Sequence, residues 1–224
     1  MIESSIIFDS IPIRYIPALS FKALTPFFDP FLRWSAREST FKPKLIEQAG
    51  IKENFRVLDL GCGTATLTIL VKKSQPSAEV TGIDIDPGVL KIAMEKAAKA
   101  GVRINLHIGT SFKLPYSNNF FDRVLSSLVL HHLTTENKIL TLKEVLRVLK
   151  PDGELHVADF GKPQNVLMWL PSVVMRRLEE SEDNYKGLLP QMIKNAGFDK
   201  VEEKNRTMTM FGTVSLFKGR KPAF

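Results

Sequence analysis

The sequence predicts an α/β protein built on a doubly wound, mostly parallel seven-stranded sheet with a C-terminal antiparallel hairpin and helical caps. From about residue 54, short strand-like runs alternate with helical runs, a pattern typical of parallel strands joined by helical crossovers. Only a turn at Phe211 and Gly212 separates the last two strand-like runs. That turn is too short for a crossover, so we expect these two strands to pair antiparallel.

Each element has its own local signal. The expected strands span residues 55–60, 78–85, 103–109, 121–130, 154–160, 199–210 and 212–220. The expected helices span residues 65–74, 87–101 and 137–150. Pro87 suits the first turn of the second helix, and Gly101 stands where a glycine commonly follows a helix. The third helix carries an apolar stripe at Ile139, Leu140, Leu142, Val145, Leu146 and Leu149.

Two segments fall outside the alternation and predict caps over the carboxyl ends of the strands. We expect residues 1–40 to form an N-terminal helical cap, and residues 41–224 to form the main domain with a cap insertion at about 161–187. Aromatic, Met and Arg side chains from both segments are candidates to surround an apolar or aromatic small molecule. They are Phe27, Phe28, Trp34, Arg37, Met168, Trp169, Met175 and Arg176. The alternatives are that they pack on the domain, or that the second segment meets a membrane surface or a second subunit.

Composition narrows the class of protein. The net charge is +7, but the basic residues are scattered, so a solvated basic surface is favoured over a nucleic-acid site. No apolar run reaches the roughly 20 residues that span a bilayer. Cys62 is the single cysteine, which excludes an intramolecular disulfide and fits a reducing cytoplasm. We therefore expect a cytoplasmic monomer or homodimer.

The stretch VLDLGCGTATLT, residues 57–68, predicts a nucleotide-binding turn. Gly61 and Gly63 lie between a strand and a helix, where glycines allow unusual backbone angles and close approach of a ligand. Asp84 ends the second strand and lies 21 residues past Gly63 (84 − 63), near the roughly 20 expected of a ribose-binding acid. The alternative is a tight turn with a helix-capping aspartate.

Four blocks together resemble the signature of class I S-adenosylmethionine (SAM)-dependent methyltransferases. They are VLDLGCGTATLT, VTGIDIDP, GTSFKLPYSNNFFDRVLSS and LKEVLRVLKPDGELHVADF. The chain is most similar to the small-molecule group that includes the quinone-biosynthesis C-methyltransferases. The resemblance covers about residues 40–220 and implies a Rossmann-like methyltransferase fold that binds SAM, yields S-adenosylhomocysteine and methylates a small acceptor.

The resemblance also implies a role for each matching residue. Asp59, Gly61, Cys62 and Gly63 would hold the methionine part of SAM, and Asp84 its ribose. The adenine would lie against Ile85, Thr110, Ser111 and Phe112, and Ser127 and Leu128 would flank the sulfonium. Two positions depart from the family pattern: Ala65 replaces a third glycine, and Thr110 replaces an aspartate that meets the adenine amino group. A neutral threonine accepts a weaker hydrogen bond than a carboxylate.

Candidate catalytic residues follow the fourth and fifth strands. His131 and His132 stand where an acceptor would meet the methyl group, and either could act as a general base. We slightly favour His132, and Asp159 at the end of the fifth strand is the third candidate. The alternatives are that the histidines cap a loop or pack against the helix that follows, and that Asp159 is a helix-capping or salt-bridging carboxylate. His107 and His156 lie within strands and are expected to be structural.

Other chemistries fit the sequence less well. A nucleophilic role for Cys62 would need an activating base and is not favoured. The adjacent histidines lack further ligands at metal-binding spacing, so we expect no metal. An RNA or protein methyltransferase, a nicotinamide oxidoreductase and a catalytically silent SAM-binding protein remain alternatives. The blocks after strands three to five argue against the oxidoreductase.

Overall fold

A seven-stranded mixed sheet forms the centre of the protein, in a computed structural model that describes residues 38–164, 182–210 and 212–223. The strand order is β3-β2-β1-β4-β5-β7-β6. The strands are β1 (Arg56–Leu60), β2 (Glu79–Asp84), β3 (Asn105–Ile108), β4 (Phe121–Ser127), β5 (Leu149–Phe160), β6 (Asp199–Thr209) and β7 (Gly212–Arg220). Strands β1 to β5 are parallel, whereas β7 is antiparallel to both β5 and β6. The predicted fold class, including its terminal hairpin, is confirmed.

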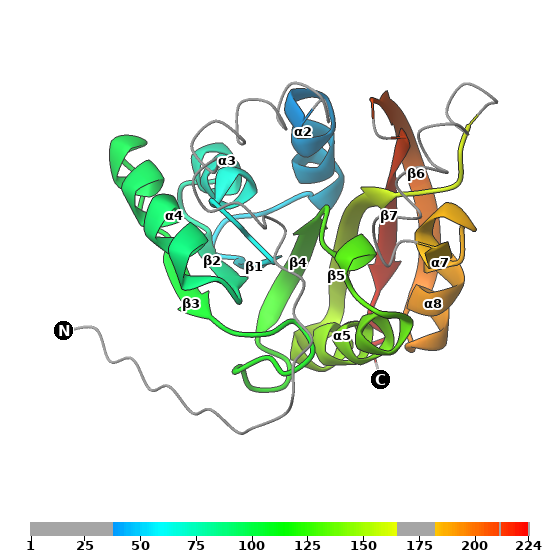
Figure 1. Ribbon diagram of the computed structural model, residues 1–224. Coiled ribbons are helices and arrows are strands. Elements are labelled where there is room, and N and C mark those ends of the chain that lie inside the picture. Colours follow the sequence, from blue (N-terminus) through cyan, green and yellow to red (C-terminus); the bar gives the residue numbers. More distant parts are fainter. Residues whose placement is uncertain (1–37, 165–181, 211, 224) are drawn as a thin grey trace.

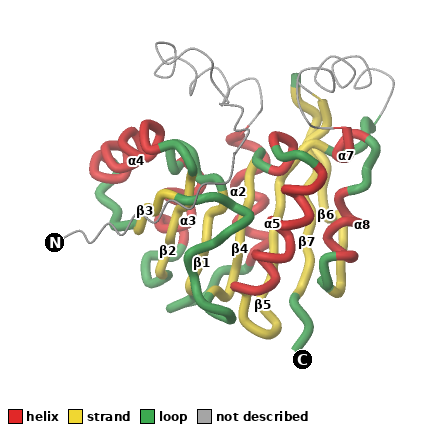
Figure 2. Tube along the Cα trace, turned by 60° about the horizontal axis from the view of Figure 1, so that its bottom comes forward, coloured by secondary structure: helices red, strands yellow, loops and turns green. Residues whose placement is uncertain are grey.

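Helices cover both faces of this sheet (Figure 1). They are α2 (Glu38–Ala49), α3 (Thr66–Ser74), α4 (Pro87–Lys99), η2 (Leu130–His132), α5 (Thr135–Val148), α7 (Glu182–Tyr185) and α8 (Leu189–Asn195). Figure 2 shows α5 running along the front of the sheet. No helix in these described ranges is long and apolar enough to cross a membrane.

The alternation of side chains along β1 divides the core between the two faces. Leu58 and Leu60 point into the cluster under α5 and α8. Val57 points into the cluster under α2 and α3. Because strand side chains alternate, Asp59 lies on the same face as Val57. The carboxylate of Asp59 is therefore directed toward α2, which precedes β1, and α3, which follows it.

The ends of two helices follow from the sequence. The carboxylate of Asp86 accepts a hydrogen bond from the backbone N–H of Gly88 at 2.7 Å, and Pro87 occupies the first turn of α4. Gly101, with φ of 67°, follows that helix as predicted. The Thr134 hydroxyl caps α5 by accepting from the N–H of Asn137 at 3.2 Å.

Some predicted boundaries were wrong or incomplete. The fourth strand ends at Ser127 rather than at residue 130, because Leu128 adopts a left-handed φ of 59° that turns the chain out of the sheet. The fifth strand begins at Leu149, earlier than predicted. Helices α2 and α8 were not predicted, and α2 runs across the domain boundary placed at residue 40.

Candidate active site

The turn after β1 takes the backbone shape that its glycines allow. Gly61 and Gly63 have φ of 65° and 51°, in the left-handed region. A Cβ on Gly61 would lie 2.6 Å from the Val129 side chain, so the turn touches the loop after β4. A Cβ on Gly63 would meet nothing within 4 Å, which leaves room beside that residue. Ala65, in the place of the third glycine, has φ of 58° and is the N-cap residue that precedes α3.

Asp84 joins the end of β2 to the glycine turn. Its carboxylate accepts hydrogen bonds from the backbone N–H of Gly63 at 2.8 Å and of Asp86 at 3.0 Å. Burial raises the pKa of Asp84, although these N–H donors oppose the rise. A carboxylate has about four lone-pair positions, so acceptor capacity remains for the hydroxyls of a sugar.

Asp59 is a buried carboxylate at the carboxyl end of β1. Only 2% of its surface is exposed, and the Thr68 hydroxyl donates to it at 2.6 Å from α3. Burial raises its pKa to about 6, while the Thr68 hydrogen bond and the charge of Lys42 act in the opposite direction. An ammonium group placed beside Asp59 would remove the cost of keeping this carboxylate ionised.

Cys62 is placed in the turn by its backbone, and its thiol points inward. The N–H of Cys62 donates to the carbonyl of Ile83 at 3.0 Å. A Cβ on Gly82 would lie 2.7 Å from the Cys62 sulfur, so the glycine makes space for the thiol. Burial raises the pKa of this thiol, which keeps it protonated and unsuited to nucleophilic attack.

The residues expected near adenine come together at the ends of β2 and β3. Ile85, Thr110, Ser111 and Phe112 are all half-buried. Thr110 pairs with Lys113 in a short antiparallel bridge. The Ser111 hydroxyl is 2.8 Å from the hydroxyl of Thr141 on α5, so it is engaged by the protein itself.

Two residues on α5, Glu144 and Arg147, hold the loop between β3 and β4. The sequence analysis did not predict this role. Glu144 accepts from the N–H of Leu114 at 2.8 Å. Arg147 donates to the carbonyls of Tyr116 at 2.7 Å and Leu114 at 3.0 Å, and is itself paired with Glu144 at 2.7 Å. The amphipathic pattern of the helix gives no sign of these contacts, because both residues stand on its polar face.

At the end of β4 the buried hydroxyls of Ser126 and Ser127 have no hydrogen-bond partner in the described part of the chain. Ser127 is next to Leu128, whose N–H donates to the carbonyl of Ala158 at 2.8 Å. A buried polar atom without a partner costs free energy unless a ligand or water satisfies it. Ser127 therefore fits a residue that faces a bound molecule.

Asp159 organises the loop that carries the two histidines. It is fully buried and accepts hydrogen bonds from backbone N–H groups and from two side chains. The donors are Val129 N at 3.2 Å, Leu130 N at 2.8 Å, His131 Nδ1 at 2.8 Å, Phe160 N at 2.7 Å and Asn184 Nδ2 at 3.2 Å. Burial would raise the pKa of Asp159, but the positive charge that His131 carries when protonated and the hydrogen bond from its ring outweigh burial and lower the pKa. Asp159 is therefore a carboxylate, and Nδ1 of His131 is the donor.

The two adjacent histidines have different environments. His131 is 3% exposed, and its ring contacts those of Phe160 and His132 at centroid distances of 4.8 and 3.9 Å. His132 is exposed. Partial desolvation and the neighbouring His131 lower the pKa of His132, which favours its neutral form. The structure thus brings His131, rather than the sequence-favoured His132, against Asp159.

Asn184, on α7, was not predicted. Its amide donates to Asp159 and, at 3.3 Å, to the carbonyl of Phe160, and the residue is fully buried. The neighbouring Asp183 accepts from the Thr135 hydroxyl at 2.6 Å and pairs with the buried Lys138 at 3.3 Å on α5. These contacts fix the chain returning from the predicted insertion to the end of β5.

Several predicted residues lie outside the described residues or away from the site. The acceptor candidates Phe28, Trp34, Arg37, Met168 and Trp169, with Phe27, Met175 and Arg176, all fall outside the described ranges. His156 is buried between Gln48 at 3.1 Å and Glu154 at 3.2 Å, and His107 is 2.9 Å from the Tyr116 hydroxyl. Both histidines thus make contacts within the fold.

Among the described residues, neither a pocket nor a cluster of possible metal ligands gives a second candidate active site. A pocket of about 150 Å³ lies at the amino ends of β1 to β3, opposite the glycine turn. Its lining residues are Arg56, Glu79, Thr81, Asn105, His107, Tyr116, Phe120 and Phe121. No group of three or more His, Cys, Asp and Glu side chains in these ranges is arranged to hold a metal ion.

Comparison with known proteins agrees with this geometry. Residues 51–213 match the methyltransferase domain family Methyltransf_31. The chain is 32% identical to the ubiquinone/menaquinone biosynthesis C-methyltransferase UbiE of Pseudomonas fluorescens, over 79% of this chain and 77% of that protein. It is 32% identical to UbiE of Shewanella pealeana, over 79% and 78%.

Solved structures share the fold. An O-methyltransferase family protein from Burkholderia thailandensis matches with a TM-score of 0.74 and 16% identity, over 92% of this chain and 61% of that one. The PH0226 protein from Pyrococcus horikoshii matches with a TM-score of 0.66 and 20% identity, over 88% and 98%. At these identities the match concerns the fold, and the family rests on the sequence relatives. The chain belongs to the class I SAM-dependent methyltransferases.

Proposed function

We propose that this protein transfers the methyl group of SAM to a carbon or oxygen atom of a small apolar or aromatic acceptor, and that His131 accepts the acceptor's proton. The observation that carries this proposal is the 2.8 Å contact between His131 Nδ1 and Asp159 Oδ1. His131 stands in the loop that touches Gly61 through Val129, beside the predicted cofactor turn, and Asp159 stands near the end of β5.

The described residues fit SAM. Gly63 leaves open space where a side chain would stand, Ser127 keeps a buried hydroxyl without a partner in the described ranges, and Asp59 is a buried carboxylate. In the proposed arrangement Asp59 takes the ammonium of the methionine moiety, Asp84 the ribose hydroxyls, and Ile85 and Phe112 border the adenine. SAM supplies a methyl group on a positively charged sulfur, which leaves as a neutral thioether when the acceptor attacks.

The protein's own task is alignment and removal of one proton. Holding the acceptor in line with the methyl group can contribute roughly 7–11 kcal/mol to lowering the barrier. With Nδ1–H bound to Asp159, the opposite nitrogen of His131, Nε2, is the basic atom. Loss of a phenolic proton raises electron density on the oxygen and on the adjacent ring carbon, so one base serves C- and O-methylation alike.

The relatives support a reduced quinone as the acceptor class. The two UbiE proteins are named for methylation at carbon in ubiquinone and menaquinone biosynthesis. The aromatic and Met residues of the two cap segments suit such a flat, apolar molecule. RNA or protein acceptors, and a SAM-binding protein without turnover, are the alternatives.

Calorimetry tests the cofactor first. Wild-type protein should bind S-adenosylhomocysteine and not NADH, and Asp84→Ala should weaken S-adenosylhomocysteine binding. Binding of NADH alone would overturn the proposal.

Turnover tests the acceptor. Reduced quinones lacking a ring methyl group, simple catechols and bulk RNA are each incubated with SAM, and methylated product is measured by mass spectrometry. Product from a quinol or catechol supports the proposal. Product from RNA alone, or tight S-adenosylhomocysteine binding without product from any acceptor, contradicts it.

A further inference from the structure

Helix α2 carries a buried lysine that the sequence did not single out. The Lys42 side chain is only 9% exposed, and its Nζ lies 2.6 Å from Oε2 of Glu38, whose side chain is 14% exposed. An ammonium group has three donor hydrogens. Among the described residues its one hydrogen-bond partner is Glu38, so donor capacity remains. A buried charge with unused donors is costly unless a ligand completes it.

The packing of α2 sets where this lysine stands. Phe41 and Leu45 are fully buried in the cluster that includes Val57 of β1 and Leu67 of α3. Asp59 points to the same face as Val57, and it accepts from Thr68 on α3. Lys42 follows Phe41 directly, and its positive charge acts on Asp59. The cation and the buried carboxylate thus belong to one side of the sheet, at the end of β1.

We propose that Lys42 binds the α-carboxylate of the methionine moiety of SAM, while Asp59 takes its α-ammonium group. This inference rests on the proposed function and adds the residue that reads the acid end of the cofactor. The methionine moiety is a zwitterion, so a site that pairs a carboxylate with a nearby ammonium matches both of its charges. Glu38, one turn earlier on the helix, orients the lysine head group before the ligand binds.

Three ligands separate a direct contact from an indirect one. S-adenosylhomocysteine has both charged groups, decarboxylated S-adenosylhomocysteine keeps only the ammonium, and 5′-methylthioadenosine has neither. If Lys42 contacts the carboxylate, Lys42→Met should weaken S-adenosylhomocysteine binding roughly tenfold or more, since hydrogen bonds to charged groups are the stronger ones. Binding of the other two ligands should stay within about twofold. Lys42→Arg should restore part of the lost affinity.

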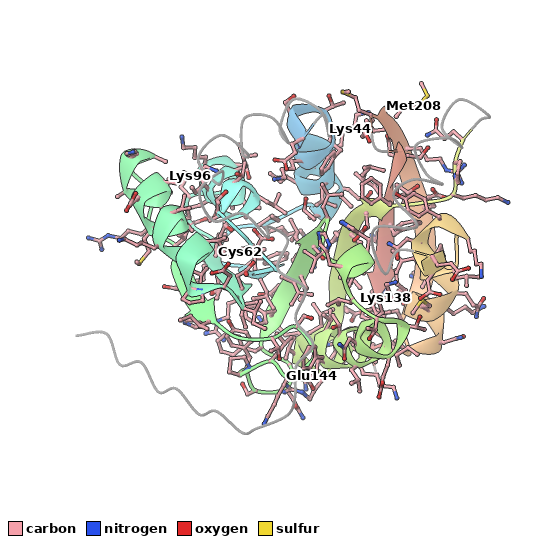
Figure 3. The ribbon with its side chains drawn as sticks, in the orientation of Figure 1. Lys44, Cys62, Lys96, Lys138, Glu144 and Met208 are labelled. Carbon is pink, nitrogen blue, oxygen red and sulfur yellow. The ribbon has the colours of Figure 1, made fainter. Side chains whose placement is uncertain are left out.

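Lys44→Met is the matched control. Lys44 is exposed on the same helix (Figure 3). Its Nζ lies 3.5 Å from Asn205 Oδ1 on β6. Its loss should leave all three affinities unchanged. Retained binding of 5′-methylthioadenosine also shows that Lys42→Met is folded.

Two results would overturn the inference while the proposed function stands. One is unchanged S-adenosylhomocysteine affinity in Lys42→Met. The other is equal weakening of S-adenosylhomocysteine and its decarboxylated form, which would mean that Lys42 acts only by keeping Asp59 ionised. Failure of the wild-type protein to bind S-adenosylhomocysteine would instead reject the proposed function itself.

Discussion

His131 and Asp159 form a buried pair across the carboxyl ends of β4 and β5, with Nδ1 and Oδ1 separated by 2.8 Å. The same carboxylate receives two backbone N–H groups of the loop that carries the histidine. Asp159 therefore fixes both the position of the imidazole and the nitrogen that bears its proton. Orientation and electrostatics are supplied by one residue, so the two effects cannot be removed separately.

Removal of the proposed base should reduce turnover without affecting cofactor binding. We expect His131→Ala to lower kcat by roughly 10²–10⁴, the usual contribution of general base catalysis. S-adenosylhomocysteine affinity, measured by calorimetry, should stay within about threefold. His132→Ala is the control, with a loss below about tenfold expected. A larger loss in His132→Ala than in His131→Ala would assign the base to His132.

Asp59 should make the unliganded protein less stable as the pH rises. Its folded-state pKa is about 6 against an ordinary 3.8, so its contribution to stability is fully present below about pH 4 and is lost as the pH rises through 6. At pH 7 the ionised group costs up to roughly 3 kcal/mol. Asp59→Asn should therefore raise the melting temperature at pH 7 and change it little at pH 4.

The same variant should lose the cofactor. An amide cannot match an ammonium as a carboxylate does, so Asp59→Asn should bind S-adenosylhomocysteine at least tenfold more weakly. Wild-type affinity should increase between pH 5 and 7, as Asp59 ionises. Flat affinity over this range would separate Asp59 from the ammonium.

Gly61 offers a test of close approach between the turn and the loop after β4. In Gly61→Ala the new methyl group would meet Val129 at 2.6 Å, besides the strain of φ at 65°. We expect at least a tenfold loss of S-adenosylhomocysteine affinity and a lower melting temperature. Gly50→Ala has φ of 52° but nothing within 4 Å, so it isolates the strain, about 1–2 kcal/mol. Equal effects in both variants would show that the contact with Val129 is unimportant.

Ala65 should tolerate replacement by the glycine that the sequence resemblance implies at this position. Its φ of 58° costs about 1–2 kcal/mol, which glycine would relieve. Its buried methyl group packs in the cluster with Ile69, Ala93 and Ala97, and removing that group costs about 0.8 kcal/mol, with a further loss because glycine makes the unfolded chain more flexible. The opposing effects nearly cancel, so Ala65→Gly should change the free energy of unfolding by less than about 1 kcal/mol in urea titration. A change above 2 kcal/mol would mean that one of these effects has been misjudged.

The sequence predicted those parts of the fold that follow from local periodicity. The strands, Pro87 in the first turn of α4, Gly101 after its end and the antiparallel hairpin were predictable because each depends on neighbouring residues. The end of β4 was not, because a left-handed Leu128 has no local signal. Helix α2 was missed because Pro43 lies inside it and its apolar pattern is weak.

The candidate site was predictable only in its motif residues. Asp59, Asp84 and the glycines come from contiguous stretches, whereas Asn184 and the proposed ligand Lys42 come from other parts of the chain. The preference for His132 over His131 could not be settled from adjacent positions, because it depends on which ring meets Asp159. The Ser111 hydroxyl likewise meets Thr141, a contact 30 residues away along the sequence.

The contacts of Asn184 affect how the segment between β5 and α8 can be exchanged in protein engineering. This segment carries the predicted acceptor residues, and its returning end is bonded to the carboxylate that orients His131. A chimera that exchanges residues 161–187 for those of a relative would also exchange a support of the base. Such a chimera would therefore change its turnover together with its acceptor preference, unless the exchanged segment keeps an amide side chain at position 184.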